Sequence, residues 1–416
     1  MSSTSAAAPR VWVVGVGMTP FGVHQDRTFY DLVDWAVGDA LADTGPQAGP
    51  EALDAVFFAT ASHGFLQGQT MVSGQIAMRR MGIEGIPVHN VENACASGAS
   101  AFALAATTIR AGDADVVLAA GAEKMHIGDA GRTMALFDSA YDVSDPAALT
   151  RTLEELGGEI DLAEVGDRSI FMDIYAALAR NHMRLYGTTA EQIAAVAAKN
   201  HVHAVHNERA HYRRAMTVDE VLSARRLAPP LTVPMCAPIT DGAAAAVLCS
   251  DEGLRRLGSQ RAVQVLASSI ASGTDRDMST FEGHISTRAA AAAYERAGVG
   301  PADIDVVEVH DATAFGEVLQ SETLGLFAPG EGGPAAARGD TTLGGRIPIN
   351  PSGGLESKGH PIGASGLAQV FELTQQLRGE SGPRQVPGAR LALAENGGGF
   401  HRGEEAAASV IILGGR

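Results

Sequence analysis

The stretch CASGASAFALAATTIRAG at residues 95–112 is followed by the apolar run DVVLAAG at 115–121, and the second half of the chain repeats this order. There HPIGASGLAQVFELTQQLRGE at 360–380 is followed by ARLALAE at 389–395. Each copy begins with a reactive side chain, passes through Gly-Ala-Ser, continues with helical spacing and returns as a strand. A duplicated α/β unit would place Cys95 and His360 at equivalent helix starts, related by a pseudo-twofold axis and facing one shared site. Chance similarity of two Ala-rich helices is the alternative.

Short apolar runs and helical patterns alternate along both halves of the chain. This alternation is typical of an α/β protein whose mostly parallel sheet is covered by helices on both faces. The expected strands are 11–16, 55–59, 115–121, 243–249, 262–270, 305–309, 391–394 and 409–413, and the expected helices outside the central stretch are 30–42, 97–111, 287–297 and 364–377.

The stretch from about 125 to 241 departs from this alternation, because it is longer than one βα unit and richer in charge. We interpret it as a lobe inserted over the sheet, with helices at 170–186 and 189–205. The predicted organisation is a flexible tail at 1–9, an N-terminal half at 10–260 that includes the lobe, and a C-terminal half at 261–416.

Composition excludes several classes of protein. The net charge of −17 argues against a nucleic-acid partner, since phosphate binding needs a basic surface. No apolar run approaches the ~18 residues of a membrane span, and the Ser/Ala-rich start lacks a signal-peptide pattern. The three cysteines, Cys95, Cys236 and Cys249, are too few for a disulfide framework. We therefore expect a protein of the reducing cytoplasm that does not bind a membrane.

Cys95 lies in VENACASGAS, residues 91–100, in a turn between a strand and a helix. Backbone N–H groups and the dipole at the helix start would stabilise a thiolate there, and small neighbours leave room for a substrate. A buried structural cysteine is the alternative, but that role needs neither a glycine-rich turn nor a position at a strand end. The pattern predicts that Cys95 is a nucleophile.

His360 lies in NPSGGLESKGHPIGASG, residues 350–366, just before Pro361 at an expected helix start. A histidine next to a cysteine can take its proton and later donate a hydrogen bond to a thioester oxygen. The surrounding glycines indicate close backbone packing.

Two more segments follow predicted strands. In HDATAF, residues 310–315, His310 and Asp311 stand where α/β proteins often hold site residues, although a helix cap by Asp311 with His310 in packing is an equal alternative. In AENGGGF, residues 394–400, the glycines offer backbone N–H groups to an oxyanion or simply form a tight turn.

Together these motifs resemble the thiolase superfamily, most closely the bacterial relatives of sterol carrier protein-type (lipid-transfer) thiolases. The resemblance covers nearly the whole chain and rests on the Cys95 segment, on Gly359–His360–Pro361, and on the order Cys, His-Asp, Gly-His-Pro and C-terminal glycines. It implies an α/β thiolase fold of two similar βαβαβαββ halves in five layers with an inserted loop domain. It also implies a homodimer or homotetramer.

The resemblance implies a role for each matching residue. Cys95 would be acylated by an acyl-CoA, so coenzyme A thioesters are substrates and no permanently bound cofactor is expected. His360 would activate Cys95 and help to hold a thioester oxygen. His310 matches the position that fixes a water in this oxyanion hole. The backbone N–H groups of Cys95 and Gly397 would form a second oxyanion hole.

The sequence departs from the family pattern at the second cysteine, which moves the proton at the α-carbon. The two places where the family keeps it are occupied by Glu395 and Ala312. Glu395 becomes a candidate base if apolar surroundings raise its pKa, and His310 is the other candidate. The expected activity is that of an acyl-CoA C-acyltransferase that forms or cleaves a C–C bond at the acyl carbon.

Two alternatives belong to other classes. The first is an aldol lyase or a Friedel-Crafts-type acyltransferase subunit that works with a small OB-fold, zinc-containing partner. Retro-aldolases of this kind lack the Cys and Gly-His-Pro residues that this chain keeps, so we rank that activity lower. The second is a non-catalytic acyl-CoA-binding scaffold, which has no need of Cys95 and His360 at duplicated helix starts.

Neither a metal site nor the coenzyme A contacts can be assigned from the sequence. His201, His203 and His206 are close together, but no Cys or carboxylate arrangement completes a site, and we interpret them as polar helix positions. The basic residues of the lobe are interpreted as a solvated helical face. They are Lys199, Arg209, Arg213, Arg214, Arg225 and Arg226.

Overall fold

The computed structural model describes residues 9–157 and 168–415. The predicted flexible tail therefore lies outside the described residues, apart from Pro9. Within the described ranges, no helix is both long and apolar enough to cross a membrane.

A mixed nine-stranded sheet runs through the molecule in the order β3-β2-β4-β7-β1-β8-β11-β10-β9. Most of these strands are buried along their whole length, which explains their near-continuous apolar sequences. The strands are β1 (Val11–Met18), β2 (Ala55–Ala59), β3 (Val88–Val91), β4 (Val116–Glu123), β7 (Gly242–Cys249), β8 (Val263–Ser272), β9 (Val306–Glu308), β10 (Leu391–Gly398) and β11 (Ala407–Gly414).

The strand order confirms the internal duplication. In the first half β2 pairs in parallel with β3 and β4, while β7 runs antiparallel to β4 and β1. In the second half β9 pairs in parallel with β10, while β11 runs antiparallel to β10 and β8. A parallel bridge between Val307 and Ile349 takes the place of the outermost strand. The two halves meet where β1 pairs antiparallel with β8, as a pseudo-twofold axis between them requires.

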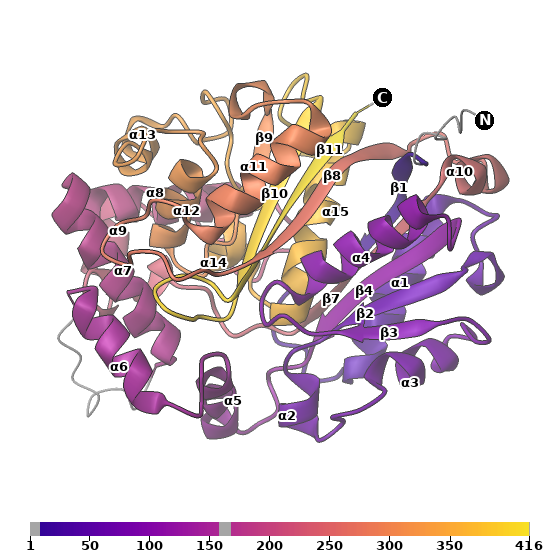
Figure 1. Cartoon of the computed structure of the whole chain (residues 1–416), viewed down its shortest axis with the longest axis horizontal. Coiled ribbons are helices and arrows are strands. Elements are labelled where there is room, and N and C mark those ends of the chain that lie inside the picture. The colour runs from indigo at the N-terminus through magenta and orange to yellow at the C-terminus, as the bar shows by residue number, and fades with distance from the viewer. Residues whose placement is uncertain (1–8, 158–167, 416) are drawn as a thin grey trace, which may run out of the picture.

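Helices α4 (Ser97–Ala111) and α15 (Ser365–Arg378) form the central layer, and both contact strands of the two halves. Helices α1 (Phe29–Thr44) and α11 (Ile285–Ala297) cover the outer faces. The resulting order is helix, sheet half, helix, sheet half, helix, which confirms the five layers of the expected fold. In Figure 1 the colour runs from indigo and purple at the start of the first half, through magenta in the lobe, to orange and yellow in the second half.

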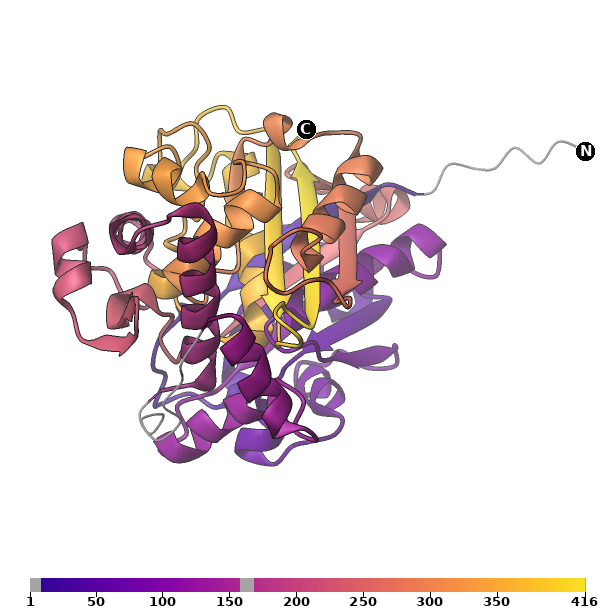
Figure 2. The ribbon, with the colours of Figure 1, turned by 60° about the vertical axis from the view of Figure 1, so that its left-hand side comes forward.

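The segment between β4 and β7 is the inserted lobe, and its helices lie together on one side of the molecule (Figure 1, Figure 2). Their apolar faces share a core with residues of α12, so the lobe is anchored to the second half of the chain. The domain boundaries predicted from the sequence stay a prediction. The lobe elements are α5 (Ala130–Leu136), α6 (Pro146–Glu155), α7 (Ile170–Tyr186), α8 (Ala190–Ala204), α9 (Val218–Ser223), β5 (Arg226–Ala228) and β6 (Leu231–Thr232).

Six shorter helices complete the described fold outside the lobe. They are α2 (His63–Gln67), α3 (Ser73–Arg80), α10 (Asp251–Leu257), α12 (Ala314–Thr323), α13 (Gly332–Arg338) and α14 (Gly354–Lys358).

The starts of the two central helices touch each other through glycine. A Cβ on Gly98 would lie 2.7 Å from the carbonyl oxygen of Gly363, and a Cβ on Gly366 would lie 2.5 Å from the backbone nitrogen of Ala99. Neither backbone can move aside easily, so this close approach requires glycine at positions 98 and 366. It brings the residues in front of both helices into one site.

Candidate active site

Cys95 stands two residues before α4, in a strained turn. Ala94 has φ 47°, a left-handed conformation that is uncommon for a residue with a side chain. The turn is held by its own polar groups, since the backbone N–H of Ala94 donates to Glu92 Oε1 and the hydroxyl of Ser97 donates to the carbonyl of Ala94. The thiol of Cys95 is thereby presented to a cavity, as expected of a nucleophile.

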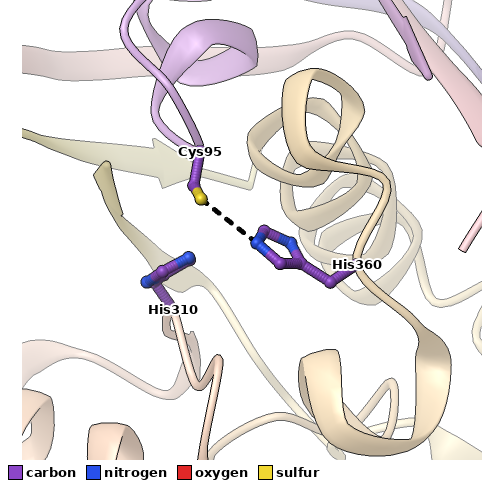
Figure 3. A group of neighbouring side chains, drawn as sticks. All are labelled: Cys95, His310 and His360. Carbon is purple, nitrogen blue, oxygen red and sulfur yellow. Dashed lines mark hydrogen bonds between the residues drawn. The ribbon is translucent and has the colours of Figure 1, made fainter. Parts of the chain in front are cut away.

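His360 meets Cys95 from the other half of the chain, with its Nε2 3.2 Å from Sγ (Figure 3). The other ring nitrogen, Nδ1, lies 2.7 Å from Ser365 Oγ. The Ser365 hydroxyl donates its proton to the carbonyl of Pro361 at 3.1 Å, so its oxygen accepts from Nδ1–H. In neutral His360 this leaves a lone pair on Nε2, which faces the thiol and is ready to accept its proton.

Burial keeps this pair neutral. Burial, with a smaller contribution from Glu123, raises the pKa of Cys95 to about 12, although hydrogen bonds from the backbone of Gly399 and of Cys95 lower it. Burial also lowers the pKa of His360 well below its usual value. The expectation of a thiolate stabilised by the helix start is therefore wrong for the free protein, because desolvation outweighs the backbone donors. Both shifts favour a neutral thiol beside a neutral imidazole.

His310 follows β9 and completes the group, since its ring centroid is 5.2 Å from that of His360. Its Nδ1 lies 3.5 Å from the hydroxyl of Tyr175, while Nε2 has no hydrogen-bond partner in the described part of the chain. Burial lowers the pKa of His310 to about 4. The ring is therefore neutral near pH 7 and carries a nitrogen available to a substrate.

Asp311 does not cap the helix that follows it, as the alternative interpretation had it, because the N-cap of α12 is Thr313. Its carboxyl accepts from the backbone N–H of Leu355 and from the side-chain amide of Asn200. It thereby ties the His310 loop to the segment that leads to His360.

The structure does not bring Glu395 to the cavity. Its carboxyl accepts from the backbone N–H of His310 and from the hydroxyl of Ser286, both at 3.1 Å. Strand β10 runs on through position 398, and alternation points Glu395 toward α11, while Ala394 belongs to the core around the central helices. Burial and the nearby Glu405 raise its pKa well above the usual value. The expected elevation of the pKa is present, but the carboxyl faces away from Cys95.

The glycine run at residues 397–399 provides a backbone group next to Cys95. Gly397 is paired with Ala408 inside the β10–β11 ladder, and it is Gly398 and Gly399 that line the cavity. The backbone of Gly399 is the group that hydrogen-bonds the sulfur of Cys95. The oxyanion role expected for the backbone N–H of Gly397 stays a prediction.

The other cysteine at the cavity does not replace the missing one. Cys236 lies beside the position of Ala312, since Ala237 N–H donates to the carbonyl of Ala312 and Cys236 bridges to Thr313. Its thiol, however, donates to the carbonyl of Thr232 at 3.5 Å, inside the lobe. Burial raises its pKa above the range of an acid–base group at neutral pH.

A cavity of about 670 Å³ opens in front of Cys95, His310 and His360. Much of its wall comes from the lobe and is apolar or aromatic. The exposed Arg225 also lines it. The apolar lining residues include Met134, Leu136, Phe137, Phe171, Met172, Tyr175, Leu227 and Phe400.

The sequence did not predict the buried charged residues near the site. Lys199 is buried and pairs with Glu317 at 2.6 Å, so the interpretation of a solvated helical face is wrong for this residue. Glu405, which lies 3.2 Å from His284, has its pKa lowered to about 2 despite burial, mainly by that histidine. Its negative charge acts against the effect of burial on His310. No signal in the sequence marks these contacts, because the partners are far apart along the chain.

His201 and His203 are buried as well. His203 accepts from Leu343 N–H through Nε2 and faces the carbonyl of Asn350 through Nδ1, and His201 faces the carbonyl of Pro234. Both rings are thus engaged by backbone groups.

Comparison with known proteins matches two family models to this chain. The model described as "Thiolase, N-terminal domain" covers residues 11–221, and the one described as "Thiolase C-terminal domain-like" covers residues 267–414.

Three relatives span nearly the whole chain. "Sterol carrier protein 2" of Oryctolagus cuniculus is 40% identical, over 95% of this chain and 72% of its own length. "Acetyl-CoA acetyltransferase" of Methanothermobacter thermautotrophicus is 39% identical, over 94% and 96%. "Benzoylsuccinyl-CoA thiolase subunit BbsB" of Thauera aromatica is 33% identical, over 94% and 95%.

Solved structures share the fold. "Ltp2-ChsH2(DUF35) aldolase" superposes with a TM-score of 0.80 at 24% identity and covers 99% of both chains. Human mitochondrial 3-ketoacyl-CoA thiolase superposes with a TM-score of 0.69 at 18% identity, over 99% of this chain and 100% of that chain. Family models, relatives and fold agree, and this chain belongs to the thiolase family of acyltransferases.

Proposed function

We propose that this acyltransferase carries an acyl group from a coenzyme A thioester on Cys95 and forms or cleaves a C–C bond at the acyl carbon. The observation that carries the proposal is the 3.2 Å contact between Cys95 Sγ and the lone-pair nitrogen of His360. Coenzyme A thioesters are then substrates, and the chemistry needs no permanently bound cofactor.

Acylation conserves the proton. His360 accepts the proton of Cys95 as sulfur attacks the thioester carbonyl, and it returns this proton to the sulfur of the departing coenzyme A. In the second half-reaction a carbanion acceptor attacks the acyl carbon, the C–C bond forms, and the bond to Cys95 breaks. The sulfur leaves as a thiolate and takes up a proton, which balances the α-proton that His310 removes from the acceptor. Cleavage runs through the same steps in reverse.

His310 is the group that we assign to the acceptor's α-proton in place of the second cysteine. Of the two candidates from the sequence, it has an unpartnered nitrogen at the cavity, whereas the carboxyl of Glu395 is turned to α11. Glu395 then acts as a positioning residue, since it holds the backbone N–H of His310. The ionised Glu405 favours the protonated form of His310 that proton transfer creates.

The size and lining of the cavity support the proposal that the acyl group is much larger than acetyl. Its volume of about 670 Å³ falls in the usual range for sites that enclose drug-sized ligands, about 300–1,000 Å³. The aromatic and aliphatic wall favours a bulky apolar acyl chain, such as a branched, cyclic or aromatic one.

A screen of acyl-CoAs tests this function. The protein is mixed with thioesters from acetyl to aromatic and polycyclic acyl groups, and the intact protein is then weighed. Bulky acyl groups should add their mass once per chain, and Cys95→Ala should abolish the adduct. Cys236→Ala, at the other cavity thiol, should keep it. Retention of the adduct by Cys95→Ala would refute the assignment of the nucleophile.

Arg225 is the cavity residue that we assign to a phosphate of coenzyme A, because it is exposed at the cavity and carries a guanidinium suited to phosphate. Arg225→Ala should raise KM for acyl-CoA severalfold and leave kcat nearly unchanged, since this contact is made equally in ground and transition states. Arg226→Ala is the matched control, since this neighbour is also exposed but lies outside the lining. Equal KM values for both variants would contradict the assignment.

A small partner protein is part of the proposal. One similar solved structure is named for the pair Ltp2-ChsH2(DUF35), and one relative is named a subunit. A partner of the predicted OB-fold, zinc-containing kind would hold coenzyme A at the cavity. Affinity capture from the native host should recover it, and recovery of this chain alone under gentle conditions would count against it. We rank aldol cleavage below acyl transfer because the chain retains Cys95 and His360. The homo-oligomeric state and the cytoplasmic location stay predictions.

A further inference from the structure

We infer that Cys95, His310 and His360 together form a reversible inhibitory binding site for a thiophilic divalent cation such as Zn²⁺, occupied only while Cys95 carries no acyl group. One ligand atom of each residue lies within 4.8 Å of the other two. The inference adds a ligand to the site and does not depend on which acyl group or acceptor the protein uses.

The donor set matches what zinc prefers. Thiolate sulfur and imidazole nitrogen bind Zn²⁺ at about 2.3 Å and about 2.0–2.1 Å in tetrahedral geometry, which separates neighbouring S and N ligand atoms by roughly 3.5 Å. Cys95 Sγ and His360 Nε2 are 3.2 Å apart, so a shift of a few tenths of an ångström would admit the ion between them. The remaining nitrogen of His310 lies within reach of both.

His310 supplies the independent observation. Its Nε2 is buried, has no hydrogen-bond partner among the described residues, and belongs to a side chain that lines the cavity. A buried polar atom without a partner is costly, and a ligand that accepts its lone pair would remove that cost. Figure 3 shows one ring nitrogen of His310 directed to the side where Cys95 and His360 face each other.

In each histidine, the ring nitrogen that would not bind the ion contacts a neighbouring hydroxyl, as is usual for metal-bound histidines. His360 Nδ1 donates to Ser365 Oγ, and His310 Nδ1 lies against the hydroxyl of Tyr175. Such contacts fix the ring and leave the other nitrogen for the ion.

Three protein ligands and one position open to the cavity would complete the coordination, with water as the fourth ligand. Binding replaces the proton of the Cys95 thiol by the metal ion, and the released proton goes to the buffer. No electron is transferred. The ion then occupies the lone pairs that thioester attack requires, so metal binding and acylation exclude each other.

Titration with CoCl₂ and ZnCl₂ alone tests the site on the metal-free, full-length protein. Wild type should bind one Co²⁺ with a sulfur-to-cobalt charge-transfer band, and Zn²⁺ should displace it and raise the melting temperature. Cys95→Ala should lose the band. His310→Ala should weaken binding at least about tenfold, because even loss of an outer contact costs that much. Cys236→Ala, at the other thiol of the cavity, should bind like wild type.

Native mass spectrometry shows whether each variant is folded and how many ions it holds, so misfolding cannot imitate loss of the site. Protein acylated beforehand should bind no ion. The inference is overturned if folded wild type binds no ion, or if Cys95→Ala binds as tightly as wild type. These outcomes are separate from the proposed function, because binding without any acyl adduct would refute only acyl transfer, and an adduct without binding would refute only the metal site.

Discussion

Replacing Glu395 distinguishes two roles for its buried carboxyl, namely general base and positioning of His310. In Glu395→Gln, the amide oxygen can still accept from the backbone N–H of His310, and the amide NH₂ can donate to the hydroxyl of Ser286. Because the pKa of Glu395 is raised well above its usual value, a neutral amide also resembles the native protonated group. We therefore expect kcat within about fivefold of wild type, equivalent to about 1 kcal/mol or less, and an unchanged pH profile.

Glu395→Ala removes both contacts. Two buried donors are left without an acceptor, at about 1–3 kcal/mol each, so the free energy of unfolding should fall by about 2–6 kcal/mol. Displacement of His310 by even about 1 Å should lower kcat by roughly 10²-fold.

The assay is steady-state acyl transfer from pH 5 to 9, together with urea unfolding of each variant. If Glu395 were the general base, Glu395→Gln would lose about 10²–10⁴-fold in kcat, with the acid limb of the pH profile gone and normal stability. That result would refute the positioning role.

Two further predictions concern the neutral pair of Cys95 and His360 and the close glycine contacts that bring the two central helix starts together. In His360→Asn, alkylation of Cys95 by iodoacetamide should be slow at pH 7, and its rate should rise about tenfold per pH unit toward pH 10. The reason is that a thiol with a pKa of about 12 forms little thiolate in that range. Wild type should show a flatter pH profile, and equal profiles for the two proteins would contradict the role of His360. Gly366→Ala places a Cβ 2.5 Å from the backbone of Ala99 and should lower the free energy of unfolding by about 2–3 kcal/mol in urea denaturation. Gly38→Ala, at an exposed helical glycine with nothing within 4 Å, should instead raise it by up to about 1 kcal/mol, and similar losses in both variants would argue against the close contact.

The repeated helix starts could be predicted from the sequence because their signal is local. Glycine, small residues and one reactive side chain recur in the same order. The close contacts of Gly98 and Gly366 explain why glycine is needed at these two positions. The meeting of Cys95 with His360 followed from that symmetry alone.

The direction of Glu395 could not be predicted in the same way. The sequence indicates a strand at 391–394, whereas β10 continues to Gly398 and turns the carboxyl to the outer face. Successive side chains of a strand point to opposite faces of the sheet. If Glu395 is taken as the start of a loop, this rule is not applied to it, and the direction of its carboxyl is not predicted.

Buried charges were missed for a different reason. Lys199 and Glu317 lie 118 residues apart on two helices, α8 and α12, and only their packing makes the pair buried. Taken singly, a lysine on a helix is more often solvated.

The most direct test of the central claim is the amount of coenzyme A released when a bulky acyl-CoA is mixed with the protein in the absence of an acceptor, followed by rapid quenching. Release should approach one equivalent per chain, with the acyl mass recovered on the peptide that contains Cys95, and Cys95→Ala should release none. Release of coenzyme A without an acyl group on that peptide, or equal release by Cys95→Ala, would contradict acyl transfer through this cysteine.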